Sequence, residues 1–398
     1  MTAEQRPIRV LYSFPHKLGA DRISNTAWQL VNATSVAGAE MIVHPGNLFR
    51  PLPPSVQVIP TLSRGMLRLP YKLLGKIRTL QLHDYIVSKR IEKLAGQIDI
   101  VHTWPVAALR TLRAAARLGI PTVLERPNAY TRFAYEVVEK ECAKLGIAMP
   151  PDHEHAYHEE ILQIEEAEYA AADYLLCPSD FVLTTFLNAG YSPQKLVRHQ
   201  YGYDPKVYSV DKSRIQGRNG LTMLFVGGVA PRKGLHYALE AWLNSPAHKN
   251  GTFLIAGEFI EGYAEKLDMM LSHSSVRRLG HRRDVAELMR KSDILVLPSI
   301  EEGSALVTSE ARGSGCVLLV SEAAGAICTH MDNALVHKVG DVNELTRQIT
   351  LLDNDRSLLS RLRSSSLNSA DKITWEAAGV RLLDVYRQVF SRKQANKS

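Results

Sequence analysis

Residues 298–315 decide the fold, and they read Pro-Ser-Ile-Glu-Glu-Gly-Ser-Ala-Leu-Val-Thr-Ser-Glu-Ala-Arg-Gly-Ser-Gly. The apolar run Asp293–Leu297 before them is typical of a buried parallel strand, and the amphipathic part that follows predicts a helix. The first N–H groups of a helix lack partners within it, and its dipole favours negative charge there. A strand, a glycine turn and a helix therefore predict a phosphate site at residues 303–306.

Two carboxylates flank this predicted phosphate site. Glu302 lies at the strand end, and Glu310 lies within the helix. Carboxylates only accept hydrogen bonds, so beside a phosphate they suit hydroxyl-rich groups. At about 1.5 Å per helical residue, the two can lie roughly 12 Å apart, which fits the two ends of a sugar-diphosphate-ribose ligand. The alternative is an exposed loop and an ordinary surface helix.

The length of the chain, 398 residues, predicts two domains. Strands and helices alternate along both halves, which predicts α/β architecture with ligands at the carboxyl ends of the strands. Periodicity is lost near the middle of the chain, where a linker is expected. The expected divisions are a first domain at 1–203, a linker at 204–220, a second domain at 221–375, and a C-terminal helix and tail at 376–398.

Individual elements follow from the hydrophobic pattern. In the first half we expect strands at 8–14, 40–44, 99–102, 121–124 and 173–179, and helices at 23–35, 106–118, 151–172 and 181–189. The loop after the first strand lacks the GxGxxG pattern, which disfavours a nicotinamide-dependent oxidoreductase.

Composition narrows the location and the partners. The four cysteines form no CxxC pair, and no run has the length of a membrane span or the pattern of a signal peptide, so a cytoplasmic protein is expected. The net charge is +7, and residues 64–93 alone hold eight basic and two acidic residues. This broken amphipathic stretch suits anionic lipid headgroups, or it is a solvated helix face. Nucleic acid is not expected as a partner.

Cations precede a second predicted helix. Arg232 and Lys233 end the loop 227–234, directly after the predicted strand 221–226, and could neutralise a diphosphate. The alternative is a solvated turn. No metal site is expected, because the histidines near the start of the helix predicted at 151–172 lack a remote ligand, and Asp353–Asp355 between two helical segments suits helix capping.

In its motifs the chain resembles the family-4 retaining glycosyltransferases, also called glycosyl transferases group 1, which have the two-domain GT-B architecture. The matching residues span nearly the whole chain and are strongest in its second half. They are Phe225–Gly228 with Arg232–Gly234, Asp293–Ser299, Glu302–Gly303 through Glu310–Ala311, Thr374–Glu376 with Tyr386, and, more weakly, Asp99–His102 and Ala172–Ser179. The resemblance implies two Rossmann-like domains facing across a cleft, with the C-terminal helix crossing back to the first.

The resemblance also implies roles for residues. Glu302 would meet the donor sugar, Glu310 the ribose, and Lys233 the leaving diphosphate, with the base near 276–280. The implied phosphate loops comprise Gly227, Gly228, Gly303, Ser304, Ala305, Leu306 and Val307. No metal or other cofactor would be needed.

The chain departs from the family pattern at two positions. The family often has Arg where this chain has Gly228, so Arg232 would replace it. Many members have a first-domain His where this chain has the loop 125–128; this leaves His102 as the catalytic candidate, with Arg126 and Asn128 on the acceptor side.

The expected function is transfer of a hexosyl unit from a nucleotide-diphosphate sugar to a saccharide or lipid-linked acceptor. Such a step belongs to polysaccharide, lipopolysaccharide or glycolipid synthesis, in the cytoplasm or on the inner face of the membrane. The alternative is a non-catalytic nucleotide-sugar-binding or partner protein of the same fold.

Overall fold

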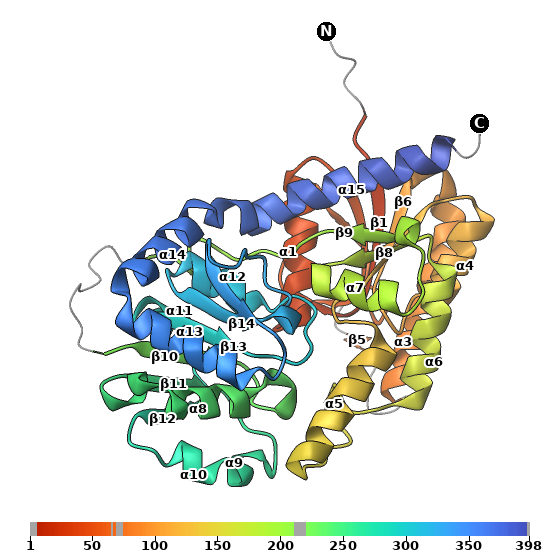
Figure 1. The fold of residues 1–398 in the computed structure, drawn as a ribbon. Coiled ribbons are helices and arrows are strands. Elements are labelled where there is room, and N and C mark those ends of the chain that lie inside the picture. Colours follow the sequence, from red (N-terminus) through yellow and green to blue (C-terminus); the bar gives the residue numbers. More distant parts are fainter. Residues whose placement is uncertain (1–5, 65–66, 69–74, 211–219, 396–398) are drawn as a thin grey trace.

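The protein forms two α/β domains, each built on its own parallel sheet (Figure 1). The computed structural model describes residues 6–64, 67–68, 75–210 and 220–395. The predicted fold class is confirmed: two sheets with helices around them face each other across a cavity.

The first sheet has the strand order β3-β2-β1-β6-β7-β8-β9, and its neighbouring strands are parallel. Its strands are β1 (Arg9–Leu18), β2 (Glu40–Leu48), β3 (Gln57–Val58), β6 (Ile100–Thr103), β7 (Thr122–Glu125), β8 (Tyr174–Cys177) and β9 (Leu196–Arg198). The helices of this domain are α1 (Ile23–Val36), α3 (Lys76–Leu94), α4 (Leu109–Arg117), α5 (Thr131–Leu145), α6 (Glu159–Ala171) and α7 (Asp180–Asn188).

Alternate residues of β1 separate two hydrophobic clusters. Val10 and Tyr12 belong to the cluster that contains α1, whereas Leu11 belongs to the cluster with Val87 of α3. Successive side chains of a strand point to opposite faces, so an apolar run in β1 supplies both layers. This is why the strand reads as continuously hydrophobic.

The second sheet has the order β12-β11-β10-β13-β14-β15 and is also parallel. Its strands are β10 (Thr222–Val226), β11 (Thr252–Ala256), β12 (Val276–Gly280), β13 (Ile294–Leu297), β14 (Val317–Ser321) and β15 (Ala334–His337). The helices here are α8 (Leu235–Asn244), α9 (Tyr263–Lys266), α10 (Asp268–Leu271), α11 (Val285–Arg290), α12 (Leu306–Gly313), α13 (Val342–Asn354) and α14 (Arg356–Asn368). Asp355 caps α14 by accepting the amide of Leu358 at 2.9 Å, as expected for the acidic triplet there.

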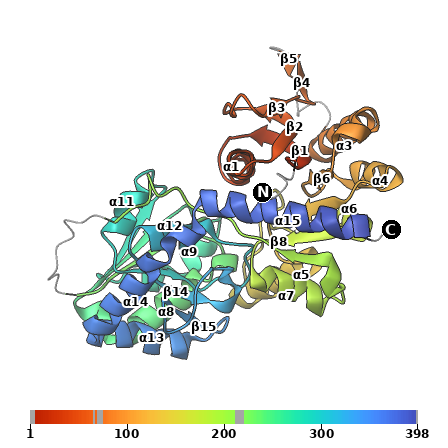
Figure 2. The same cartoon turned by 90° about the horizontal axis from the view of Figure 1, so that it is seen from above.

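The last helix, α15 (Trp375–Ala395), returns to the first domain and lies along α1 (Figures 1 and 2). Gly379 lets the two helices approach, because an ideal Cβ there would lie 2.4 Å from the carbonyl carbon of Ala33. Further along α15, the hydroxyl of Tyr386 hydrogen-bonds Nδ1 of His102 at 2.7 Å. The predicted crossing of the C-terminal helix is therefore confirmed.

The chain passes between the domains at two places that touch each other. The amide of Tyr203 donates to Ile373, and the amide of Trp375 donates to the carbonyl of Tyr203, each at 3.2 Å. Gly202 packs so closely here that an ideal Cβ would lie 2.4 Å from the backbone of Thr374. We name this pair of passages, residues 202–203 and 373–375, the crossover pair.

Helix α5 forms a second bridge, far from α15 in Figure 1. Its Glu141, which is buried, hydrogen-bonds Nε2 of His236 at 2.9 Å and the hydroxyl of Tyr237, both in α8 of the second domain. We name this contact the α5–α8 bridge.

Three parts of the chain differ from the sequence-based expectations. The helix expected at 151–172 begins at Glu159, because Pro150 and Pro151 hold an irregular segment before it and His158 caps its first turn. Helix α5 was missed. In the basic segment, Ser63–Arg64 and Leu67–Arg68 pair as antiparallel strands β4 and β5, and α3 begins only after Gly75, which has φ 77°.

The other positions of the basic segment, 65–66 and 69–74, lie outside the described residues. None of the helices within the described ranges is both long and apolar enough to cross a membrane.

Replacing Gly379 with Ala tests the packing of α15. In a free helix this change stabilises by about 1 kcal/mol. Here the added methyl group meets the backbone of Ala33, so we expect a loss of about 1–3 kcal/mol, measured as a lower Tm. The exposed neighbour Val380 offers a control, since V380A touches no comparable contact. A raised Tm for G379A would contradict the close approach.

Candidate active site

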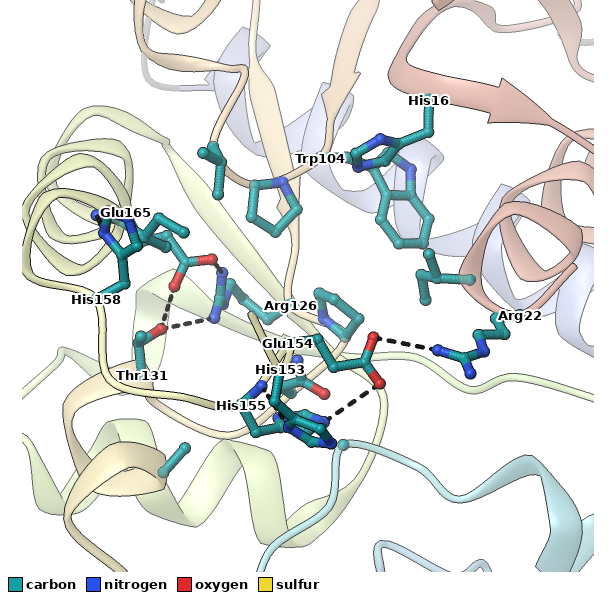
Figure 3. A pocket seen from close by; sticks show the side chains of 18 of the residues that line it. His16, Arg22, Trp104, Arg126, Thr131, His153, Glu154, His155, His158 and Glu165 are labelled. Atoms are coloured by element: carbon teal, nitrogen blue, oxygen red, sulfur yellow. Dashed lines mark hydrogen bonds and ion pairs between the residues drawn. The ribbon is translucent and has the colours of Figure 1, made fainter. Parts of the chain in front are cut away.

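A cavity of about 1330 Å³ lies between the two domains (Figure 3). The first domain contributes the loop after β1, the start of α3, the loops after β6 and β7, and the segment before α6. The second domain contributes Lys233 and residues 302–306. The carboxyl ends of strands from both sheets therefore meet at one space, as in other open α/β folds.

The cationic loop after β10 is shaped by one glycine. Gly234 has φ 67°, and an ideal Cβ there would lie 2.1 Å from the carbonyl oxygen of Pro298. Only glycine combines this left-handed conformation with so close an approach. The turn ends the short helix Pro231–Lys233 and begins α8, which places Lys233 at the cavity wall.

Glu302 lies in a buried ionic cluster. Arg232 donates to Glu301 at 2.7 Å and to Glu302 at 3.1 Å, and Lys233 forms an ion pair with Glu302. Ser299 also donates to Glu302, at 3.2 Å. We name Arg232, Lys233, Glu301 and Glu302 the ionic cluster.

The cluster keeps Glu302 ionised. Burial alone would raise the pKa of this carboxyl, but Arg232 and Lys233 lower the pKa to about 2. At neutral pH, Glu302 is therefore a pure hydrogen-bond acceptor at the cavity wall. This is the property expected of a group that binds sugar hydroxyls.

The predicted site residues divide into two groups. Those that line the cavity are Lys233, Glu302, Gly303, Ser304, Ala305, Leu306, Arg126 and Asn128. Those that are not part of its described lining are Gly227, Gly228, Arg232, Val307, Glu310 and His102. Most of the stretch around Glu302 is thus brought to the cavity, whereas the glycine loop after β10 lies outside it.

Helix α12 begins where the sequence predicts, with Ala305 as its cap residue. The amide of Ala305 is engaged, since it donates to the carbonyl of Ala324 at 3.3 Å. Gly303 abuts the first domain: an ideal Cβ there would lie 1.5 Å from the carbonyl oxygen of Pro127, and its own carbonyl accepts from Ser179. Gly303 is therefore needed for the contact between the domains.

Arg232 does not take the position expected of a diphosphate ligand. Its side chain is buried between Glu301 and Glu302. The arginine neutralises two buried carboxylates, which accounts for its place in the structure.

His102 also differs from the expectation of a catalytic group. It is fully buried, and its two nitrogens contact Tyr386 at 2.7 Å and Glu125 at 3.3 Å. Glu125 further contacts His199 and Tyr201, both at 2.8 Å. His102 therefore belongs to a buried network beneath α15, because the strand that carries it ends under that helix.

Arg126 lines the cavity but is committed to the first domain. Its guanidinium contacts Glu165 and Thr131, each at 3.2 Å, and stacks 4.4 Å from the ring centre of Tyr169. Asn128 also lines the cavity. Its neighbour Ala129 donates its amide to Glu301 at 3.2 Å, which joins the loop to the ionic cluster.

The segment before α6 supplies wall residues that the hydrophobic pattern does not predict. His153, Glu154 and His155 lie together in the cavity, with Glu154 facing Arg22 across it at 3.8 Å (Figure 3). Burial, together with the nearby Arg232, lowers the pKa of His155 to about 3, so the ring is neutral. The two proline residues before the histidines were the available signal that this segment is a loop.

Metal ligands are not gathered here. Across residues 6–64, 67–68, 75–210 and 220–395, no group of three or more His, Cys, Asp or Glu side chains has an arrangement that could hold a metal ion.

Glu310 lies in α12, outside the cavity lining, and accepts a hydrogen bond from the hydroxyl of Tyr208. Burial raises the pKa of its carboxyl to about 7. At neutral pH the site is therefore poised between the acid and the carboxylate, which an incoming hydroxyl-rich ligand could influence.

Comparison with known proteins agrees with the two-domain α/β fold. Residues 220–355 match the family Glycosyl transferases group 1. The chain is 26% identical, over 75% of its length and 76% of the relative's, to the UDP-Gal:alpha-D-GlcNAc-diphosphoundecaprenol alpha-1,3-galactosyltransferase of Escherichia coli.

A shorter alignment, 30% identical over 30% of this chain, joins it to the N,N'-diacetylbacillosaminyl-diphospho-undecaprenol alpha-1,3-N-acetylgalactosaminyltransferase of Campylobacter jejuni. That alignment spans only 32% of the relative. Among solved structures, sucrose-phosphate synthase of Thermosynechococcus elongatus has the same fold, with a TM-score of 0.68, 17% identity, and coverage of 97% of this chain and 100% of that one. The match to the group 1 glycosyltransferases thus lies in residues 220–355, and the chain as a whole has the GT-B fold.

Replacing Arg232 with Met tests how much this arginine stabilises the ionic cluster. Loss of the arginine leaves two buried carboxylates with too little positive charge, so we expect a loss of about 3–5 kcal/mol in the free energy of unfolding. Lys233 is less buried and pairs with Glu302 alone, so K233M is the matched variant and costs less. Chemical denaturation of both proteins measures the difference. Equal losses would contradict the central position of Arg232.

Glu310 predicts a pH dependence of stability. The pKa of this carboxyl rises from 4.5 in the unfolded chain to about 7 in the folded one, so the folded state holds more protons between these values. The wild-type protein therefore loses stability as pH rises through this window, by up to about 3 kcal/mol. E310Q removes this titrating group, so the Tm of E310Q minus the Tm of the wild-type protein should increase from pH 5 to pH 8. Parallel curves for the two proteins would refute the shift.

Proposed function

We propose that the protein transfers a hexosyl unit from a nucleotide-diphosphate sugar to an acceptor hydroxyl, with retention of the anomeric configuration and without a metal. The observation that carries the proposal is the Lys233–Glu302 pair, which faces the cavity beside the start of α12. A cation, a fixed carboxylate and helix amides are the groups that a sugar diphosphate requires.

The two relatives support the class of acceptor. Both are named for transfer to a sugar that is linked through diphosphate to undecaprenol. The proposed pathway is accordingly the synthesis of a polysaccharide, a lipopolysaccharide or a glycolipid, at the inner face of the membrane.

In the proposed reaction, the acceptor oxygen bonds to the anomeric carbon while the bond from that carbon to the diphosphate breaks. Negative charge grows on the leaving diphosphate, and the departing diphosphate oxygen takes the proton that the acceptor hydroxyl loses. Lys233 would exchange Glu302 for the diphosphate, and the N–H groups of Leu306 and Val307 would face the distal phosphate. Fixed dipoles and cations of this kind stabilise the transition state electrostatically.

The carboxylates would hold the remainder of the donor. Glu302, released from Lys233 but still held by Arg232, would accept from sugar hydroxyls. Glu310 would accept from the ribose after Tyr208 turns away from it. Because Lys233 and helix amides supply the positive charge, the proposal needs no cation from solution.

A donor screen and two substitutions test this function. UDP-, GDP- and ADP-sugars are compared by thermal shift, since a ligand that binds only the folded state raises its Tm. With the donor so found, K233M and E302Q should each lower the rate of sugar transfer into a bacterial lipid extract by about 100-fold or more. Lys249, an exposed cation of the second domain, provides the control variant K249M.

The outcomes separate the alternatives. Donor binding without transfer to any extract would favour a non-catalytic nucleotide-sugar-binding protein. Full transfer activity in both K233M and E302Q would overturn the roles given to these residues.

A further inference from the structure

One part of the cavity lining carries positive charge outside the proposed donor site. Four cations line it from two segments of the first domain: Lys17 near the end of β1 with Arg22 after that strand, and Lys76 and Arg78 at the start of α3. One acid, Asp21, lies on the same wall. We name these four cations the basic wall.

Acids occur on the opposite side of the cavity. Asp152, Glu154 and Glu160 line it from the segment before α6 and the start of that helix. Glu154 reaches across to Arg22 at 3.8 Å, and both side chains are mostly exposed. The cavity is therefore polarised, and the excess of positive charge lies at residues 76–78 and at Lys17.

The basic wall is open to a ligand. Lys76 and Arg78 are exposed, and neither takes part in an ion pair found among the described residues. Lys17 is also exposed, and its ammonium lies 4.2 Å from the ring centre of Phe49. Like charges held together at a cavity repel one another, and an anion relieves that cost.

The floor beside these cations is neutral. It consists of Phe14, His16 and Trp104, which Figure 3 shows in part: His16 lies next to Trp104. Burial, with a contribution from Lys76, lowers the pKa of His16 to about 4, so its ring carries no charge at neutral pH. Rings of this kind suit the faces of a sugar or a short apolar chain.

From this arrangement we infer that the basic wall binds the phosphate or diphosphate of the acceptor, chiefly through Lys76 and Arg78. The inference rests on the proposed function, because Lys233 and α12 on the other domain already serve the donor diphosphate. Two anionic groups on opposite sides of one cavity require two separate sets of cations. The sugar that follows the acceptor phosphate would then lie over the neutral floor and direct its hydroxyl toward Glu302.

Titration calorimetry with octyl diphosphate tests the inference, with UDP present in saturating amount so that the donor site is filled. The double variant K76Q/R78Q should bind this probe about tenfold more weakly or worse, because two charge-assisted contacts are lost. The swap K76R/R78K keeps both charges and should retain most of the affinity. Circular dichroism and Tm establish that each variant is folded.

The matched control is K93Q/R113Q, which removes the same charge from exposed positions of α3 and α4 outside the cavity lining. It should bind octyl diphosphate as the wild-type protein does. Equal affinity of K76Q/R78Q and wild type, or an equal loss in both double variants, would overturn the inference.

Vesicles separate the possible sources of phosphate. If the cavity binds an acceptor, the fraction of protein that floats with phosphatidylglycerol vesicles should be the same for K76Q/R78Q and K93Q/R113Q. A loss confined to K76Q/R78Q with vesicles, and not with octyl diphosphate, would assign these cations to a bilayer and contradict the inference. Failure of UDP to raise the Tm of the wild-type protein would count against the proposed function. Titrations with octyl diphosphate in the absence of UDP would still test whether the basic wall binds a diphosphate.

Discussion

The burial of two adjacent carboxylates, Glu301 and Glu302, is the constraint on which the site depends. A buried carboxylate is costly unless it is paired, and Arg232 pairs with both. The same constraint joins the domains, because Glu301 also accepts the amide of Ala129 from the first domain. Charge neutralisation, the wall of the cavity and the contact between domains thus rest on one cluster.

Another buried carboxylate plays a similar part within the first domain. Glu125 ends β7 and is surrounded by His102, His199 and Tyr201, and His102 continues the network to Tyr386 of α15. The pKa of Glu125 is lowered to about 2, since the two histidines offset the burial that would raise it. The network positions the loop that begins at Arg126 and explains why the strand-end histidine does not face the cavity.

The fold was predictable from sequence because its signals are local. Apolar runs such as 294–297 fix the parallel strands, and the glycine turn at 303 fixes the start of α12. Residues of the candidate site could be placed from sequence only where a motif specifies both the residue type and its position, as for Lys233 and Glu302, which line the cavity. The positions of Arg232 and His102 depend on the neighbours that pack over them, Glu301 over Arg232 and α15 over His102. Hydrophobic periodicity does not predict such contacts. His153 and His155 were misread because their segment was assigned to a helix that begins later.

The crossover pair and the α5–α8 bridge together determine how this cavity can change its width. Both passages of the chain between the domains meet at residues 202–203 and 373–375, so a rotation of one domain against the other pivots there with little displacement. The α5–α8 bridge lies away from that pivot, and any opening must first separate Glu141 from His236 and Tyr237. His236 is three residues from Lys233, so the α5–α8 bridge also restrains the segment that carries this cavity-lining lysine. Opening of the cavity therefore breaks the contacts of the buried Glu141 together with those that Ala129 and Ser179 make to the second domain.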